Sequence, residues 1–371
     1  MTVGIDASNI RAGGGVTHLR EMLRAADPAG FGVQSVRVWG GSSTLSALKE
    51  RPWLERVYEP MLDRTAFHRA WWQRYELPKR LSAVDALLVP GGIFQGDFHP
   101  YVAMSQNMLP FDPKMVKMYR VGSFKWAKLR MVKKLQLSTF RRADGVIFLS
   151  KFSRDWIGPL ISPEPFPNCV IPHGIEQRFF PPERRDVEGD EFHVVYVSGV
   201  HWYKHQNDVA HSIAVLRAEG IPIRATFVGP VYFQPAGDAL HQTIAALDPA
   251  GDFLLHAGKV SFDEIDRIYR EADAFVFASA CESFPNILLE AMASGLPIAS
   301  SNRGPMPEIL GEHGVYFDPE DSVSIASALR QLYGDPGLRR ALASASQARA
   351  LEYSWERCAT ETFSFLRQVA S

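Results

Sequence analysis

The sequence contains few cysteines, no excess of either charge and no long apolar run. Its 371 residues include three cysteines, Cys169, Cys281 and Cys358, whose odd number and spacing argue against a disulfide framework or a zinc site and favour a reducing compartment. The 40 basic and 41 acidic residues argue against a nucleic-acid-binding chain. No apolar run approaches the ~18 residues that cross a membrane, and residues 1–6 lead into a strand without a signal segment. We therefore expect a cytoplasmic protein.

Two common cofactor motifs are also missing from the sequence. Neither half has Gly-x-Gly-x-x-Gly after its first strand, which weakens the case for a dinucleotide oxidoreductase. Asp-x-Asp does not occur, so no evident carboxylate pair would hold a divalent metal. We predict a protein that needs neither metal nor cofactor.

Short β-branched runs alternate with longer helical patterns along the chain. The runs are 33–39, 84–89, 145–149, 193–197, 223–228 and 297–300. This alternation predicts a doubly wound α/β fold, and about 150 residues per domain predicts two domains. A stretch rich in proline and charge, 179–190, breaks the pattern and is the expected linker between residues 1–178 and 191–353.

The strongest functional pattern lies in the second half. Residues 274–278 predict a buried strand, and apolar residues recur at helical spacing from Ile287 until Gly295 offers a C-terminal stop. Pro285 fits the first helical position. The unpaired N–H groups at the start of this helix, together with its macrodipole, suit a phosphate group.

Two glutamates flank this helix start. Glu282 precedes it and Glu290 lies two turns in, about 12 Å further at ~1.5 Å per residue. Both carboxylates accept hydrogen bonds, so they suit the hydroxyls of a sugar and of a ribose. The spacing alone equally allows Glu282 to cap the helix and Glu290 to be an exposed helical residue.

The residues around the two glutamates add to this pattern. Residues 290–295 read Glu-Ala-Met-Ala-Ser-Gly, 302–308 read Asn-Arg-Gly-Pro-Met-Pro-Glu, and 170–175 read Val-Ile-Pro-His-Gly-Ile. These segments resemble glycosyltransferase family 4, in which two glutamates flank seven residues. The resemblance covers essentially the whole C-terminal half of the chain.

The resemblance implies a GT-B architecture, in which two Rossmann-like doubly wound parallel-sheet domains face each other across a cleft. Residues 1–178 would bind the acceptor, with residues 354–371 packing back onto them. Residues 191–353 would bind a nucleotide-sugar donor. The implied chemistry is retaining and independent of metal.

The family carries an arginine after the first strand of the second domain and a lysine five positions later, both on the diphosphate of the donor. Lys204 matches the lysine, whereas Gly199 replaces the arginine. Lys204, which could otherwise be an exposed loop lysine, would stabilise the leaving nucleotide electrostatically. Lys204 and Glu282 are the two residues expected to be catalytic. The implied donor site comprises Gly14, Gly15, Gly199, Lys204, Val260, Glu282, Ser283, Phe284, Pro285, Asn286, Ile287 and Glu290. Gly14 and Gly15 belong to a glycine-rich loop that lets the backbone approach a ligand, although a plain flexible turn would look the same.

The acceptor candidates are Gln106, Asn107, His18 and His173. Gln106 and Asn107 stand where many relatives have a His-Asp or His-Asn pair, and an amide cannot act as a general base at neutral pH. The front-face mechanism that the resemblance implies needs no side-chain base. A lone histidine such as His18 or His173 is more often structural than catalytic.

Residues 113–143 contain ten basic residues and no acidic one. We interpret them as a patch for an anionic membrane surface. The alternatives are a solvated basic helix with its aromatic side chains packed inward and, less favoured, a nucleic-acid patch, which would lack a recognised motif.

We expect a hexosyltransferase that transfers a mannose-type sugar to a lipid-linked glycan in bacterial surface polysaccharide assembly. We expect it to be a peripheral protein at the cytoplasmic face of the inner membrane. The alternatives are a nucleotide-sugar 2-epimerase of the same architecture and a catalytically silent nucleotide-binding module.

Overall fold

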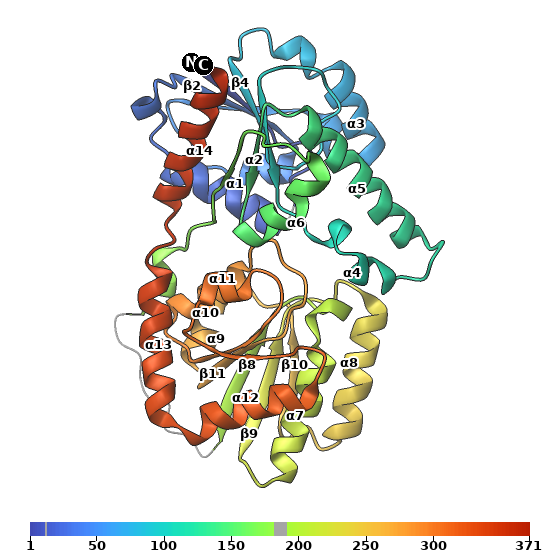
Figure 1. Cartoon of the computed structure of the whole chain (residues 1–371), viewed down its shortest axis with the longest axis vertical. Helices are drawn as coiled ribbons and strands as arrows, with labels where there is room; N and C mark the ends of the chain where they lie inside the picture. The colour runs from blue at the N-terminus through green and yellow to red at the C-terminus, as the bar shows by residue number, and fades with distance from the viewer. Residues whose placement is uncertain (12, 182–190) are drawn as a thin grey trace. The chain divides into compact units, whose positions relative to one another are not determined.

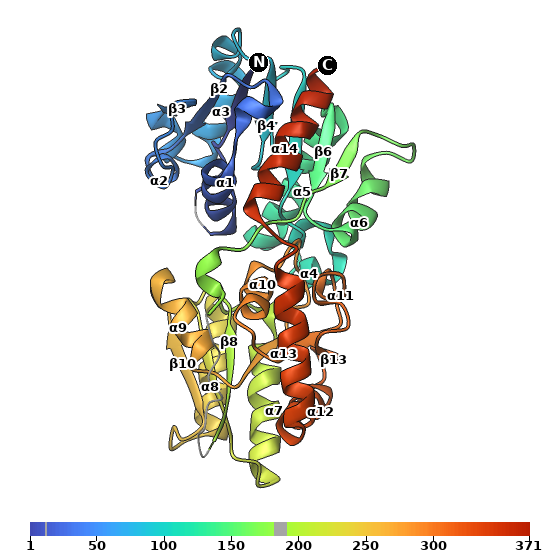
Figure 2. The same cartoon turned by 90° about the vertical axis from the view of Figure 1, so that its left-hand side faces the viewer.

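The computed structural model describes residues 1–11, 13–181 and 191–371 and divides the chain into two compact units. Unit 1 comprises Met1–Gly174 and Tyr353–Ser371, and unit 2 comprises Ile175–Glu352 (Figures 1 and 2). Residues 175–178, which the sequence assigned to the first domain, therefore cluster with unit 2. Most of the expected linker, residues 182–190, lies outside the described residues.

The described part of unit 1 contains a seven-stranded sheet in the order β3-β2-β1-β4-β5-β6-β7, and its pairs are parallel. The strands are β1 Thr2–Asp6, β2 Ser35–Gly40, β3 Leu54–Tyr58, β4 Ala86–Val89, β5 Tyr101–Ser105, β6 Gly145–Phe148 and β7 Asn168–Val170. The central strands β4, β5 and β6 are buried along their whole lengths, as expected for strands covered on both faces.

Helices connect these strands and cover the sheet. They are α1 Gly14–Ala25, α2 Ser42–Ser46, α3 Ala66–Tyr75, α4 Pro113–Lys117, α5 Phe124–Arg142 and α6 Lys151–Ile161. The C-terminal helix α14, Trp355–Ala370, packs against α1 and against β4 and β5 (Figure 2). The last helix of the chain is thus part of the core of unit 1.

The described part of unit 2 contains a six-stranded parallel sheet in the order β10-β9-β8-β11-β12-β13. The strands are β8 Phe192–Val197, β9 Ile223–Val228, β10 Leu254–Gly258, β11 Ala274–Phe277, β12 Ile298–Ser301 and β13 Val315–Phe317. The helices are α7 Gln206–Ala218, α8 Gln234–Leu247, α9 Ile265–Arg270, α10 Asn286–Ala293, α11 Met306–Leu310, α12 Ser322–Gly334 and α13 Pro336–Ala350. Both units are doubly wound α/β structures, which confirms the predicted fold class.

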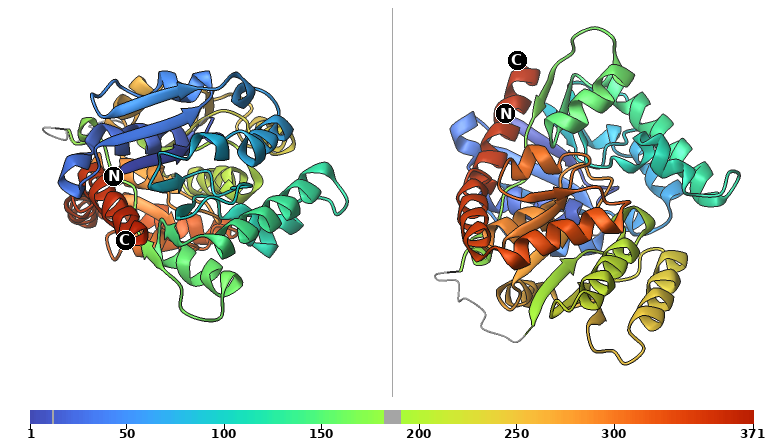
Figure 3. Two further views of the ribbon diagram at one scale, coloured as in Figure 1. Left: turned by 90° about the horizontal axis from the view of Figure 1, so that it is seen from above. Right: turned by 60° about the horizontal axis from the view of Figure 1, so that its bottom comes forward.

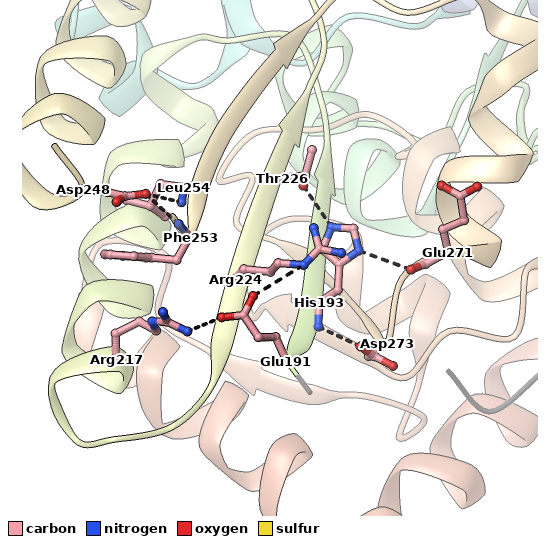
Figure 4. Close-up of polar contacts among 10 residues, drawn as sticks. All are labelled: Glu191, His193, Arg217, Arg224, Thr226, Asp248, Phe253, Leu254, Glu271 and Asp273. Carbon is pink, nitrogen blue, oxygen red and sulfur yellow. Dashed lines mark hydrogen bonds and ion pairs between the residues drawn. The ribbon is translucent and has the colours of Figure 1, made fainter. Parts of the chain in front are cut away.

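A polar cluster fixes the amino ends of the strands in unit 2 (Figure 4). The backbone N–H of His193 donates to Asp273 at 2.7 Å. Its ring contacts the Thr226 hydroxyl at 2.9 Å and the Glu271 carbonyl at 3.2 Å. Burial lowers the pKa of His193, so the imidazole is neutral at pH 7. The remaining contacts in the figure pair Glu191 with Arg217 and Arg224, and Asp248 with the amides of Phe253 and Leu254.

These contacts lie at the end of the sheet opposite to the loops that follow β8 and β11, and we assign them a structural role. None of the described helices is both long enough and apolar enough to cross a membrane.

Candidate functional site

The candidate site lies where the chain order reverses in the sheet of unit 2. From β8 the chain passes to β9 and β10 on one side, and from β11 it passes to β12 and β13 on the other. The carboxyl ends of two such neighbouring strands form the usual binding crevice of an open α/β sheet. The loops that follow β8 and β11 meet here, because the amide of Ala280 donates to the carbonyl of Tyr203 at 2.8 Å.

Lys204 and Glu282 form an ion pair between these two loops. Lys204 ends a short 3-10 turn and is only 9% exposed. The hydroxyl of Ser279 donates to the same Glu282 carboxylate at 2.7 Å, and the Lys204 ammonium lies 5.5 Å from the centre of the Phe277 ring. The structure therefore brings together the two residues predicted to be catalytic and holds the cation at the crevice.

Helix α10 begins beside this pair, one residue later than predicted. Pro285 has non-helical backbone angles and occupies the N-cap, so its placement at the first helical position was wrong. Its carbonyl accepts the amides of Leu288 and Leu289 at 3.0 and 3.2 Å, because the first turn closes on the N-cap carbonyl. The Leu288 amide is thus not available to a ligand, whereas among the described residues the Ile287 amide has no hydrogen-bond acceptor.

Glu290 lies in the second turn of α10 and accepts a hydrogen bond from the Tyr269 hydroxyl at 3.1 Å. Tyr269 is fully buried. Burial raises the pKa of Glu290 to about 7, against the opposing effects of the Tyr269 hydrogen bond and the charge of Arg178. A carboxyl group with this pKa is found more often at functional positions than on ordinary helix surfaces.

At Gly199, the position that departs from the family pattern, the structure shows which side chain a substitution would displace. A Cβ atom at this position would collide with the ring of Tyr232. Tyr232 is 71% exposed, and its ring occupies the direction that a side chain at position 199 would take. The missing arginine and the presence of Tyr232 are therefore two parts of one local arrangement.

The other predicted donor residues of unit 2 surround these groups. Ser283 and Phe284 are buried in the loop before α10, Asn286 is the first residue of α10, and Val260 follows the end of β10 half-buried. Their contacts with a donor remain predictions.

In unit 1 the glycine-rich loop forms the start of α1. Gly13 is the N-cap with φ 68°, and no side chain caps the helix. Val16 and Thr17 donate to the Gly13 carbonyl, while the amides of Gly14 and Gly15 have no acceptor among the described residues. These two amides have the geometry expected of an anion site, but their role toward a donor remains a prediction.

The acceptor candidates separate into two groups. Gln106 and Asn107 follow β5 and are partly or fully exposed; Gln106 donates to the Met104 sulfur at 3.0 Å, and Asn107 accepts the Leu109 amide at 3.2 Å. Both amides remain candidates for contact with an acceptor.

His18 and His173 are instead buried. The His18 ring is fully buried and lies 4.6 Å from the His173 ring and 5.9 Å from the Trp355 ring, measured between centroids. Burial, with the neighbouring His173, lowers the pKa of His18 well below its usual value. The ring of His18 is thus enclosed by its neighbours in unit 1, and its contact with an acceptor stays a prediction. His173 is 4% exposed, and its contact with an acceptor likewise stays a prediction.

Sequence reasoning missed several residues of the unit 2 site. They are Ser279 beside Glu282, Tyr269 beside Glu290, Tyr232 over Gly199, and His205. His205 follows Lys204 with φ 52° and is the one non-glycine residue of positive φ in the described ranges. Such a conformation in a non-glycine residue costs about 1–3 kcal/mol and is found preferentially at functional sites. The sequence gives no signal that His205 adopts a positive φ.

The predicted absence of a metal remains a prediction. Within the described ranges, no group of three or more His, Cys, Asp or Glu side chains is placed to hold a metal ion.

Comparison with known proteins first defines the class. The chain superposes on sucrose-phosphate synthase from Thermosynechococcus elongatus with a TM-score of 0.79, at 18% identity over 99% of this chain and 98% of that one. It superposes on HepE of Anabaena in complex with UDP-glucose with a TM-score of 0.74, at 16% identity over 98% and 99% of the two chains. These likenesses establish a GT-B fold.

Sequence comparison then gives a family match for part of unit 2. Residues 191–335 match the family described as Glycosyl transferases group 1, so this region of the chain is similar to that family. O-antigen chain mannosyltransferase B of Escherichia coli is 33% identical over 110 residues, which are 30% of this chain and 29% of that protein. The chain spans 29%, 52% and 64% of the first three curated relatives that it matches. The predicted resemblance to GT-B glycosyltransferases is thus confirmed, and assignment to family 4 in particular stays a prediction.

Proposed function

We propose that the protein is a retaining glycosyltransferase that binds a nucleoside-diphosphate hexose in unit 2. The observation that carries this proposal is the Lys204–Glu282 pair beside the start of α10. Together with Glu290, this arrangement brings the Lys204 ammonium, the Ile287 amide, which is unpaired among the described residues, and two carboxylates to the switch point of the sheet. The family match over residues 191–335 covers all four groups.

Separate protein groups would bind the diphosphate, the hexose and the ribose of the donor. The Lys204 ammonium and the Ile287 amide would bind the diphosphate, which must compete with Glu282 for the lysine. Once released from the lysine, the Glu282 carboxylate can accept hydroxyls of the hexose. Glu290 can accept the ribose hydroxyls when it is ionised. No metal is needed in this arrangement, because the positive groups belong to the protein.

In the transfer step, the bond between C1 of the hexose and the phosphate oxygen breaks. The acceptor hydroxyl forms the new bond to C1 on the same face, and its proton passes to the departing phosphate oxygen. Lys204 and the start of α10 stabilise the charge that develops on the leaving nucleoside diphosphate, which is the electrostatic contribution that usually dominates such sites. A side-chain base is not required.

We further propose a mannose-type hexose and a lipid-linked glycan acceptor in bacterial surface polysaccharide assembly, on the cytoplasmic side of the membrane. The local identity with an O-antigen chain mannosyltransferase supports the sugar and the type of product. HepE, which binds UDP-glucose, is a structural neighbour only, so GDP, UDP and ADP donors all belong in the first test.

The test measures the fate of each nucleoside-diphosphate hexose with and without octyl glycosides as acceptor analogues. We expect transfer only when acceptor is present, with the anomeric configuration of the donor kept and with chelator having no effect. Lys204→Met should lower kcat/KM by about 100-fold, whereas Arg340→Met, which removes an exposed cation from α13, should leave it unchanged.

Three outcomes would contradict the proposal. An inverted product excludes the retaining mechanism. A sugar epimerised at C2 in the absence of acceptor indicates the 2-epimerase alternative. Tight nucleotide binding with no turnover of any donor indicates the silent binding module.

A further inference from the structure

A groove lies between α4 and α5 in unit 1, bordered by the 3-10 turn Leu109–Phe111. Its volume is about 550 Å³. The lining side chains are of two kinds, apolar and basic, and include Val116, Val121, Trp126, Arg130, Lys133 and Lys134. The guanidinium of Arg130 lies 4.9 Å from the centre of the Trp126 ring, so the apolar wall and the positive charge are adjacent.

The cations around the groove lack carboxylate partners. In the described part of the chain, no acid lies within ion-pair distance of Lys117, Arg130, Lys133 or Lys134. The nearest acids along the chain have other partners: Asp112 caps α4 through the amides of Lys114 and Met115, and Asp144 pairs with His99. The groove therefore presents uncompensated positive charge.

Most of α5 is not packed into the core of unit 1. Its buried residues are Gln136, Thr139 and Phe140, all in the C-terminal half. The aromatic side chains near its start do not all pack inward, because Phe124 is 83% exposed. This exposure argues against an ordinary solvated helix whose aromatic residues face the core.

The turn that joins α4 to α5 carries exposed apolar side chains at its tip. Val121 is 74% exposed and stands three residues before Phe124. In Figures 1 and 3 this turn projects away from the sheet of unit 1. Basic residues flank the apolar pair on both sides, at Lys117 and Arg120 before it and at Lys125 and Lys128 after it.

We propose that this groove binds the headgroup of an anionic phospholipid at a bilayer surface, while Val121 and Phe124 enter the boundary between headgroups and acyl chains. Charge complementarity identifies the occupant, since the basic side chains match a phosphodiester and the apolar wall matches the adjoining glycerol and first methylenes. A protein partner with this combination would have to be both acidic and apolar over the same small area. The proposal does not depend on the transfer reaction.

The cations and the tip contribute in different ways. Each basic side chain that contacts the headgroup in the groove strengthens binding by roughly five-fold, and a cation outside the groove contributes less because it has no fixed contact with a phosphate; salt screens both contributions. The apolar tip contributes a part that salt does not screen, because its effect is the removal of apolar surface from water. A membrane site of this kind should therefore be weakened by salt but not abolished by it.

The test is flotation of the purified full chain with vesicles of phosphatidylcholine, with and without phosphatidylglycerol. We expect binding to the anionic vesicles at low salt and little binding to the neutral ones. The triple variant Lys117→Gln, Lys133→Gln, Lys134→Gln should bind the anionic vesicles about 100-fold more weakly. Phe124→Ser should remove the binding that remains at high salt.

The matched control removes three cations of the same segment outside the groove lining, as Arg120→Gln, Lys125→Gln, Lys128→Gln. A clearly smaller loss in this control supports a site at the groove, whereas an equal loss in the two triple variants shows a diffuse basic surface and overturns the proposal. Equal binding to neutral and anionic vesicles overturns it as well.

Two further measurements distinguish lipid binding at the groove from a nucleic-acid surface and from a change in the donor site. Duplex DNA that displaces the protein from vesicles and binds it more tightly than they do would indicate a nucleic-acid surface and refute the proposal. Thermal stabilisation by nucleoside diphosphate should be the same in the groove triple variant and the wild type, because Lys117, Lys133 and Lys134 are not among the predicted donor-binding residues. A loss of vesicle binding alone then concerns only the groove.

Discussion

Lys204 and Glu282 neutralise each other across two loops that lie 78 positions apart in the sequence. Sequence reasoning proposed each residue separately, but it could not predict that they contact each other, because that contact depends on where β8 and β11 end. The same limit applies to the burial of His18, which the sequence did not predict. Its burial depends on His173 and Trp355, which approach it from two distant segments of unit 1.

Glu290 should make the stability of the protein depend on pH. Its folded pKa of about 7 lies above the ordinary glutamate value, so its stabilising effect is fully present below about pH 4.5 and is lost as pH rises through 7. The Glu290→Gln variant should not lose this stability, because glutamine does not ionise. From about pH 5 to pH 8, the variant should gain up to about 3 kcal/mol relative to the wild type.

Thermal unfolding of both proteins across this pH range measures the difference. Glu312→Gln, which changes an exposed carboxylate of the same unit, should follow the wild type. Parallel curves for wild type and Glu290→Gln would show that Glu290 titrates normally. In the same series, nucleotide binding by the wild type should strengthen as Glu290 ionises.

Gly199 and Tyr232 allow the missing family cation to be restored. An arginine at position 199 collides with the Tyr232 ring, so Gly199→Arg alone should bind nucleoside diphosphate no better than the wild type. Gly199→Arg with Tyr232→Ala should bind it roughly 10-fold more tightly, as expected for one added charge-assisted hydrogen bond. Calorimetric titration of the two variants, with Tyr232→Ala as the control, decides the outcome. Equal affinity in all three would show that position 199 does not face the diphosphate.

At the scale of single elements, sequence periodicity predicted the strands that carry the site more closely than the start of the helix. The predicted run 223–228 coincides with β9, Ile223–Val228, because β-branched residues and flanking turns define both ends. The start of α10 was misplaced by one residue, since the side-chain pattern does not show that the first turn closes on the Pro285 carbonyl. The return of α14 to unit 1 was expected only from the family resemblance.

The Pro-His-Gly turn provides a test of how α14 is held. A Cβ atom at Gly174 would collide with the backbone of Ser354 and Trp355, whereas one at Gly334 meets no atom within 4 Å. Gly174→Ala should destabilise unit 1 by about 1–3 kcal/mol through overpacking. Gly334→Ala should be neutral or slightly stabilising.

Hydrogen exchange gives the measurement for this pair. In Gly174→Ala the amides of residues 355–370 should exchange at least five-fold faster than in the wild type, and in Gly334→Ala they should not change. Unchanged protection of α14 in Gly174→Ala would show that the turn can shift without disturbing the helix.

At the scale of the whole molecule, the alternation of strands and helices predicted two doubly wound units, and the structure contains them. The order of strands within each sheet determines where the switch point falls, and this order follows from long-range pairing that composition and periodicity do not encode. For that reason the sequence could name the glutamates and the lysine as candidates, while their grouping around the carboxyl ends of β8 and β11 required the structure.

The most direct test of the account is a crystal structure of the protein with the nucleoside diphosphate that stabilises it most against heat. We predict that the diphosphate lies within hydrogen-bond distance of Lys204 Nζ and of the Ile287 amide, with the ribose hydroxyls on Glu290. A nucleotide bound elsewhere in the molecule, or one bound in unit 2 while Lys204 remains paired with Glu282, would contradict it.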